Sequence, residues 1–260
     1  MTQTELTALA LTLFAGMATV IGSFISLFVK QTNNKLLAYS LGFSAGVMIY
    51  VSMVELYPKS MEYLEGMYGT FWGNVISTAS FFGGIMLIAF IDYLIPTAEG
   101  DIGNTQKEKA VSLKKMGLLT ATAIAIHNFP EGLVTFTSAY KDIGIGIMIA
   151  IAIAIHNIPE GISASLPIFF ATGDRKKAFL VSFFSGITEP LGAIMGYLIM
   201  KPYLNDGLIG ILFAIVSGIM MFISLEELLP MAREYEKSRL TILSVILGML
   251  VMAITLIMMI

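Results

Sequence analysis

Eight long apolar runs, separated by short polar connections, are the feature of this sequence that most restricts its fold. A helix needs about 20 residues to cross the ~30 Å hydrocarbon core of a bilayer. We therefore expect an all-α polytopic membrane protein with eight transmembrane helices, formed as a single transmembrane domain over residues 1–260. The predicted spans are residues 6–29, 36–57, 75–95, 117–139, 143–170, 178–200, 208–229 and 240–260.

The composition agrees with a bilayer environment. Hydrophobic residues make up 57% of the chain and charged residues 13%, whereas a soluble domain carries roughly 25% charged residues. The net charge of −3 says nothing about a nucleic-acid partner, but the lack of a basic patch with interleaved aromatic residues argues against one. The sequence has no cysteine, so a metal site in this chain would use nitrogen and oxygen ligands.

Lysine and arginine are unevenly divided between the predicted loops. Twelve of the 15 follow the first, third, fifth and seventh spans, and the loops after the second, fourth and sixth spans hold one each. Positively charged loops favour the cytoplasmic side of a membrane. This bias predicts a multi-pass protein of the cytoplasmic membrane with both termini outside.

Two internal repeats relate pairs of spans. Residues 123–132 (AIAIHNFPEG) and 152–161 (AIAIHNIPEG) match at nine of ten positions, in spans predicted to run in opposite directions. A weaker repeat links residues 45–58 (AGVMIYVSMVELYP) to 217–230 (SGIMMFISLEELLP), each read as the end of a span. Opposed repeats are typical of inverted-topology transporters, so we predict a 3+2+3 inverted repeat. For the weaker pair, chance similarity between apolar helices is the alternative.

The stronger repeat holds the polar residues of two spans in one frame, HNxPEG. The chain has only two histidines, and each lies four positions before a glutamate. Residues four apart share one face of a helix. The polar positions of the two frames are His127, Asn128, Glu131, His156, Asn157 and Glu160.

Pro130 and Pro159 interrupt these two spans at mid-membrane depth. A proline inside a helix removes one backbone donor and displaces the carbonyl four residues earlier, which here belongs to Ile126 or Ile155. A partly unwound helix at that depth is tolerated only where it faces protein or a water-filled cavity. We therefore predict kinked, partly unwound helices around an ion site.

Glu189 adds a third acid at depth, in the sixth span. A lone carboxylate at the bilayer centre costs at least a few kcal/mol, so converging acids require cations or protons. Imidazole, carboxylate and amide oxygen together suit Zn²⁺, Fe²⁺ or Mn²⁺. Two alternatives are open. A histidine could serve only as an interhelical hydrogen-bonding residue, and Glu189 could serve only in helix packing. Glu226 and Glu227 are either solvated acids or part of a metal exit, and Asp92 is expected to be structural.

The motifs HNFPEG at 127–132, HNIPEG at 156–161 and TEP at 188–190 resemble those of the ZIP metal transporters, especially a bacterial branch with this motif pair. The resemblance implies uptake of Zn²⁺, with Fe²⁺ and other divalent ions such as Mn²⁺, Cd²⁺ and Co²⁺ as further substrates. It implies no prosthetic cofactor, an elevator-like or rocking movement within the lipid bilayer, and a plausible homodimer. Many ZIP proteins carry a histidine-rich loop, which the predicted connection 96–116 lacks.

The same resemblance implies two overlapping ligand sets. Zinc is assigned to Glu131, His156 and Glu160. The oxygen-rich set for iron is Asn128, Glu131, Asn157, Glu160 and Glu189. His127 stands at a metal-ligand position of related ZIP proteins.

A secondary metal transporter is the leading interpretation, and we expect no enzymatic activity. The sequence has no phosphate-binding loop, and a negative-inside potential favours entry of a divalent cation. One alternative is an intramembrane zinc-dependent hydrolase, although the His-Glu-x-x-His motif of such proteases is absent. The other is a metal exporter with the same ligands.

Overall fold

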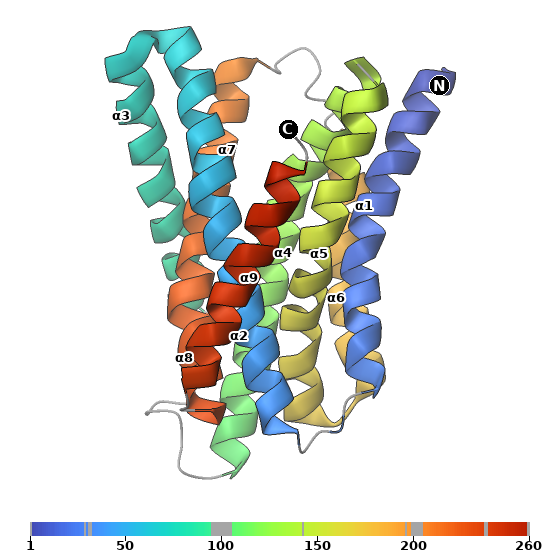
Figure 1. The fold of residues 1–260 in the computed structure, drawn as a ribbon, viewed down its shortest axis with the longest axis vertical. Coiled ribbons are helices and arrows are strands. Elements are labelled where there is room, and N and C mark those ends of the chain that lie inside the picture. Colours follow the sequence, from blue (N-terminus) through green and yellow to red (C-terminus); the bar gives the residue numbers. More distant parts are fainter. Residues whose placement is uncertain are drawn as a thin grey trace.

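The computed structural model describes residues 2–28, 30, 33–94, 106–141, 143–195, 197, 198, 205–236 and 239–258. Within these ranges the elements are all helical, as predicted, and they lie side by side along one direction (Figure 1). In chain order they are α1 (Gln3–Phe28), α2 (Asn34–Val51), the π-helical turn η1 (Ser52–Leu56), α3 (Tyr57–Leu94), α4 (Gln106–Lys141), α5 (Ile143–Thr172), α6 (Arg175–Met195), α7 (Asp206–Phe222), the π-helical turn η3 (Ile223–Leu228), α8 (Leu229–Tyr235) and α9 (Arg239–Ile257).

Six helical stretches of the described chain are long and apolar enough to cross a bilayer. They do not include α4, a helix of 36 residues that contains the predicted span 117–139. The chain is therefore a multi-pass membrane protein. The six stretches are Gln3–Phe24, Asn34–Leu94, Ile149–Thr172, Arg175–Met195, Asp206–Tyr235 and Arg239–Ile257.

The stretch Asn34–Leu94 reverses direction at Gly69. This glycine has φ 77° and ψ 163°. Residues with a Cβ rarely adopt this conformation. The two arms of α3 are joined by a 2.9 Å hydrogen bond between the Ser60 and Ser77 hydroxyls. Asn74 Nδ2 also donates to Glu65 Oε1 at 2.6 Å. The 61 residues of this stretch therefore form two antiparallel segments, visible at the upper left of Figure 1.

The prediction that spans end at Pro58 and Pro230 is wrong, because the helix continues past both prolines. A π-helical turn precedes each proline, η1 before Pro58 and η3 before Pro230. In η1 the N–H of Tyr57 donates to the carbonyl of Ser52, five residues earlier. The wider turn lets the chain accommodate a residue without an N–H donor and continue as helix.

The predicted connection 96–116 is also partly helix. Residues 95–105 lie outside the described chain, but residues 106–116 form the first turns of α4. Their sequence, QKEKAVSLKKM, is polar yet built largely from good helix formers. The helix therefore begins before the apolar run, and hydropathy alone places its start too late.

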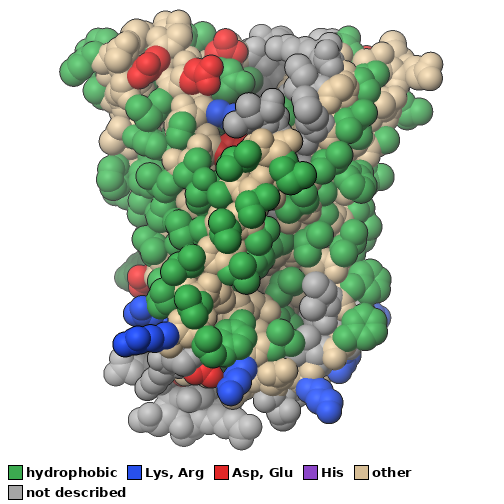
Figure 2. Space-filling view, in the orientation of Figure 1, with side chains coloured by type: hydrophobic (Ala, Val, Ile, Leu, Met, Phe, Trp, Pro, Cys, Tyr) green, Lys and Arg blue, Asp and Glu red, His purple; other side chains and the backbone are tan. Residues whose placement is uncertain are grey.

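Apolar side chains cover a wide band across the face of the molecule that Figure 2 shows. Phe71 and Met86 on α3, for example, are each 71% exposed. On the face shown, Lys and Arg gather mainly near the lower end and Asp and Glu near the upper end. Exposed apolar surface on this scale suits contact with lipid rather than water.

The helices form two groups. In Figure 1, α2, α3, α7 and α9 lie to the left, and α1, α5 and α6 lie to the right with α4. Small residues bring neighbouring helices into backbone contact: a Cβ at Gly22 of α1 would collide with the carbonyl of Ile158 on α5. The largest cluster of buried apolar side chains joins the two groups and includes Leu41, Leu166 and Ile219.

Candidate metal centre

Six of the seven predicted ligands have described side chains, and all six are buried. His127 is 1% exposed, Glu131 is 6% exposed, and the others are fully buried. They come from the middles of α4 and α5 and from α6. The fully buried members are Asn128, Asn157, Glu160 and Glu189. His156 lies on α5, but its side chain is outside the part that the structure describes.

The backbone of both frames stays helical. Residues 126–132 lie within α4 and residues 155–161 within α5, with Pro159 inside the helix. The predicted partial unwinding is therefore wrong. One proline removes only one donor, so the helical hydrogen bonds on either side of it can persist. Ser44 of α2 donates a 3.0 Å hydrogen bond to the Pro159 carbonyl, so a second group of helices contacts the frame.

His127 lies between two of the carboxylates. Its Nε2 is 3.2 Å from Oε2 of Glu131, one turn further along α4. The same nitrogen is 3.5 Å from Oε1 of Glu160 on α5. The i, i+4 spacing thus places His127 and Glu131 on one face, as predicted, and that face meets α5.

Asn157 is fixed by two helices. Its Nδ2 donates to the carbonyl of Ala15 on α1 at 3.0 Å and to Oε2 of Glu189 on α6 at 2.8 Å. With both amide hydrogens used, the amide orientation is set by the network. Its Oδ1 and Oε1 of Glu189 are buried and have no hydrogen-bond partner among the described residues.

Asn128 is fixed in a matching way. Its Nδ2 donates to the carbonyl of Ser185 on α6 at 3.1 Å. Its Oδ1 is buried and lacks a hydrogen-bond partner within the described chain. A buried oxygen without a donor costs about 1–3 kcal/mol, and a bound cation would offset that cost.

Three acidic side chains meet at the centre. Glu131 and Glu160 lie close enough to Glu189 to act on its carboxylate. Three carboxylates in a buried, low-dielectric region are strongly unfavourable unless protons or cations compensate them. The arrangement therefore suits a divalent cation, for which it offers carboxylate and amide oxygens with an imidazole nitrogen alongside.

Glycines of the two frames let neighbouring helices reach the centre. A Cβ at Gly132 would collide with the carbonyl of Glu189, and a Cβ at Gly161 would collide with the carbonyl of Thr19. The sequence did not indicate that α1 takes part. The available signal was Gly161. A glycine one helical turn from buried polar residues often marks the close approach of another helix.

The described side chains do not by themselves complete a metal-binding group. No cluster of three or more His, Asp or Glu among them could hold a metal ion. His156, an expected ligand, lies outside that set. The ligand assignments drawn from the sequence therefore stay predictions.

Asp92, Glu226 and Glu227 lie away from the centre. Asp92 Oδ1 on α3 forms a 2.7 Å ion pair with Lys115 Nζ on α4. Glu227 of η3 is partly buried and interacts electrostatically with Asp92, Lys115 and Glu226. Asp92 thus has the structural, interhelical contact expected of it.

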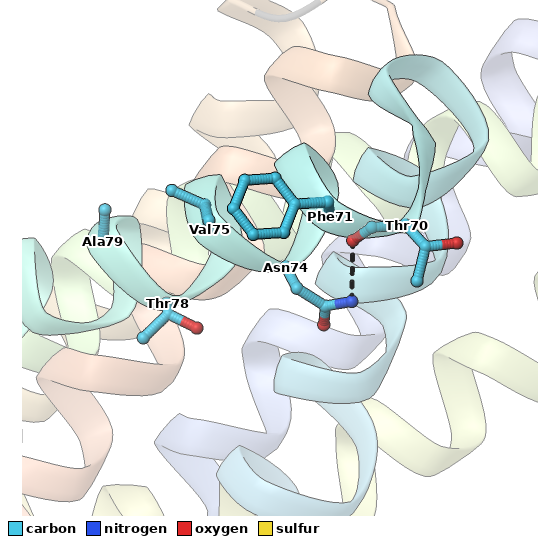
Figure 3. A pocket seen from close by; sticks show the side chains of 6 residues that line it. All are labelled: Thr70, Phe71, Asn74, Val75, Thr78 and Ala79. Atoms are coloured by element: carbon cyan, nitrogen blue, oxygen red, sulfur yellow. Dashed lines mark hydrogen bonds between the residues drawn. The ribbon is translucent and has the colours of Figure 1, made fainter.

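A groove of about 770 Å³ lies elsewhere, on α3 beyond the Gly69 turn (Figure 3). Phe71 and Val75 line it, and Asn74 Nδ2 donates to the Thr70 carbonyl at 2.8 Å. Apart from Asn74 and two threonines, its lining is apolar. None of the predicted metal ligands belongs to it.

The family model and the similar proteins that match this chain all carry the description of a zinc transporter. A family model described as ZIP Zinc transporter matches residues 97–256. The chain is 54% identical to "Zinc transporter ZupT" of Oceanobacillus iheyensis, over 96% of this chain and 97% of that protein. It is 53% identical to "Zinc transporter ZupT" of Streptococcus mutans, over 98% of each. For the protein of that name in Clostridium perfringens, the identity is 52%, over 96% of this chain and 95% of the relative.

Proposed function

Since this chain belongs to the ZIP zinc transporter family, we propose that it is a secondary transporter that carries zinc into the cell across the cytoplasmic membrane. Members of this family are membrane transporters and not enzymes. The intramembrane hydrolase considered from the sequence is therefore excluded. The remaining alternative, export with the same ligands, is an outcome of the test below.

The buried junction of α4, α5 and α6 is the observation that carries this proposal. There Glu160 and Glu189 are fully buried and Glu131 nearly so, in a molecule whose surface carries a wide apolar band (Figure 2). Such acids in a membrane helix bundle usually mark an ion path. We assign zinc to Glu131, His156 and Glu160, with His127 beside them.

Iron and other divalent ions would use a more oxygen-rich set. The amide oxygens of Asn128 and Asn157 and Oε1 of Glu189, which have no hydrogen-bond partner among the described residues, support this part of the proposal. Neutral and anionic oxygens suit Mn²⁺ and similar hard cations. The full set is Asn128, Glu131, Asn157, Glu160 and Glu189.

Eight membrane crossings are our interpretation of the helices. The Gly69 reversal divides Asn34–Leu94 into two crossings, and α4 adds one more. An even number of crossings agrees with both termini lying toward the same end of the molecule (Figure 1). From the Lys and Arg bias we propose that this end faces outward.

Close contacts around α4 and α5 support the 3+2+3 inverted repeat. Gly161 of α5 packs against the carbonyl of Thr19 on α1. Its counterpart in the other frame, Gly132 of α4, packs against the carbonyl of Glu189 on α6. The pair α1 and α5 therefore resembles the pair α6 and α4, as an exchange of the two halves requires.

The outer helices follow the same relation. Gly218 of α7 packs against the carbonyl of Phe81 on α3, and Gly46 of α2 against that of Val245 on α9. Gly46 and Gly218 are equivalent positions of the weaker sequence repeat. That repeat also places a π-helical turn before its proline in both copies. These coincidences make chance similarity a poor explanation.

Uptake of radioactive zinc into metal-starved cells tests the proposed function. Glu131→Gln and Glu160→Gln keep side-chain size but remove the charge, and each should lower the initial rate at least about tenfold. Glu62→Gln, at an exposed position of α3, is the control. Rates equal to the control in both variants would refute the proposal, and net loss of zinc from the cells would indicate export instead.

A further inference from the structure

Thr19 is a fully buried residue of α1, and its hydroxyl differs in its hydrogen bonding from those of two other buried threonines. Threonine within a helix commonly bonds the carbonyl four residues earlier. Thr12 does so with Ala8 at 3.0 Å, and Thr135 does so with Glu131 at 2.9 Å. Thr19 Oγ1, in contrast, has no hydrogen-bond partner among the residues that the structure describes.

The carbonyl to which the Thr19 hydroxyl would ordinarily donate already accepts a hydrogen bond from Asn157. The carbonyl four residues earlier belongs to Ala15, and it accepts the amide of Asn157 at 3.0 Å. The carbonyl of Thr19 itself accepts Ser182 Oγ at 3.2 Å and packs against Gly161. The backbone around Thr19 is therefore fixed by residues of α5 and α6, while no described residue forms a hydrogen bond with its hydroxyl.

Thr19 and Glu189 occupy reciprocal places where α1 crosses α6. A Cβ built on Gly186 would lie 3.1 Å from the Thr19 Cβ and 3.6 Å from its Oγ1. A Cβ built on Gly16 would lie 3.1 Å from the Glu189 Cβ. Thr19 and Glu189 are separated by as many positions as Gly16 and Gly186, so the proposed two-fold relation exchanges them.

The partner of Glu189 extends this relation into the centre. Glu189 accepts a hydrogen bond from Asn157, and the repeated frame makes Asn128 the counterpart of Asn157. The relation therefore pairs Thr19 with Asn128 as it pairs Glu189 with Asn157. Thr19 Oγ1 and Asn128 Oδ1 are both buried and both lack a hydrogen-bond partner in the described chain.

We propose that Thr19 is a further specificity-determining residue, whose hydroxyl forms with Asn128 Oδ1 a neutral oxygen half-site for a divalent cation or a water bound to it. This inference rests on the proposed transport function. One half of the centre would carry the acidic side chain of Glu189, and the other half only the neutral oxygens of Thr19 and Asn128. The second half would then add ligands without adding repulsion between carboxylates.

Such a half-site favours particular ions. Zinc is satisfied by four ligands and accepts imidazole readily, so it depends little on an additional hydroxyl. Mn²⁺ and Fe²⁺ take more ligands, and for Mn²⁺ oxygen is preferred. Loss of the Thr19 hydroxyl should therefore weaken the binding of Mn²⁺ and Fe²⁺ more than the binding of zinc.

Competition between metals during uptake tests this assignment. We expect Thr19→Val to raise the ratio of the Mn²⁺ inhibition constant to the zinc KM about tenfold, and Thr19→Ser to keep the original ratio. Thr120→Val is the matched control, because Thr120 is equally buried, also lacks a hydrogen-bond partner in the described chain, and precedes His127 by about two turns. Thr19→Ala removes the same hydroxyl if the valine variant is absent from the membrane.

Three outcomes would overturn the role of Thr19. They are a ratio in Thr19→Val equal to that in Thr120→Val, an equal loss of both metals, and failure of Mn²⁺ and Fe²⁺ to inhibit zinc uptake by the unmodified protein. Failure of the transport function itself would look different, since zinc uptake would then be insensitive to Glu131→Gln and Glu160→Gln.

Discussion

The amide nitrogen of Asn157 donates a 2.8 Å hydrogen bond to Oε2 of Glu189, joining α5 to α6 inside the helix bundle. The side chain of Glu189 is fully buried, and a buried acceptor that loses its donor keeps the cost of leaving water. The same nitrogen also bonds the Ala15 carbonyl on α1. Asn157 therefore connects three helices.

Replacing Asn157 should destabilise the protein more than replacing Asn128. Asn157→Ala removes two bonds and leaves a buried carboxylate without its donor, which should lower the free energy of unfolding by about 2–3 kcal/mol. Asn128→Ala removes a single bond to the Ser185 carbonyl and should cost about 1 kcal/mol. Chemical unfolding of the purified protein in detergent measures both. Equal losses would show that the bond to Glu189 adds no stability.

Alanine at either frame glycine should disrupt the fold. A Cβ at Gly132 or Gly161 would collide with a backbone carbonyl of α6 or α1, and backbone cannot rotate out of the way as a side chain can. Gly83→Ala on α3 is the control, because a Cβ there meets nothing within 4 Å and alanine favours helix by up to about 1 kcal/mol. We expect folded protein after detergent extraction only for Gly83→Ala. Normal yields of the other two variants would contradict the close packing.

The positions of most helices could be predicted because bilayer thickness sets the length of an apolar run. The errors occur where backbone geometry, and not hydropathy, decides. At Pro58 a π-helical turn lets the helix continue into the predicted connection, as far as the reversal at Gly69. The start of α4 at Gln106 was missed because a polar sequence of good helix formers carries no membrane signal.

The candidate centre was predictable only in part. The HNxPEG spacing correctly predicted that His127 and Glu131 share a face, and the structure brings Glu160 and Glu189 close to them. The carbonyls that orient the two asparagines could not be predicted, because every residue has a carbonyl and only the packing selects Ala15. For the same reason nothing in the sequence singled out Thr19.

The ion pair between Lys115 and Asp92 should couple α4 to α3. Its 2.7 Å separation and its limited exposure, 17% and 26% of the two side chains, favour a measurable interaction. A double-mutant cycle of Lys115→Met and Asp92→Asn should give a coupling free energy of about 1 kcal/mol in unfolding. Lys114→Met, at an exposed neighbouring position, should show no coupling to Asp92→Asn. Additive effects of Lys115→Met and Asp92→Asn would mean that the pair contributes nothing.

Zinc should stabilise the folded protein through the buried carboxylates. A ligand that binds only the folded state at 100 times its Kd adds about 2.7 kcal/mol, so zinc should raise the Tm of the purified protein and a chelator should reverse the rise. Removing both Glu131 and Glu160 charges, in the Glu131→Gln, Glu160→Gln double variant, should abolish most of the shift. Mg²⁺ should shift the Tm less, because it releases its water reluctantly. A zinc-induced shift that persists undiminished in the double variant would place the bound ion somewhere other than this centre.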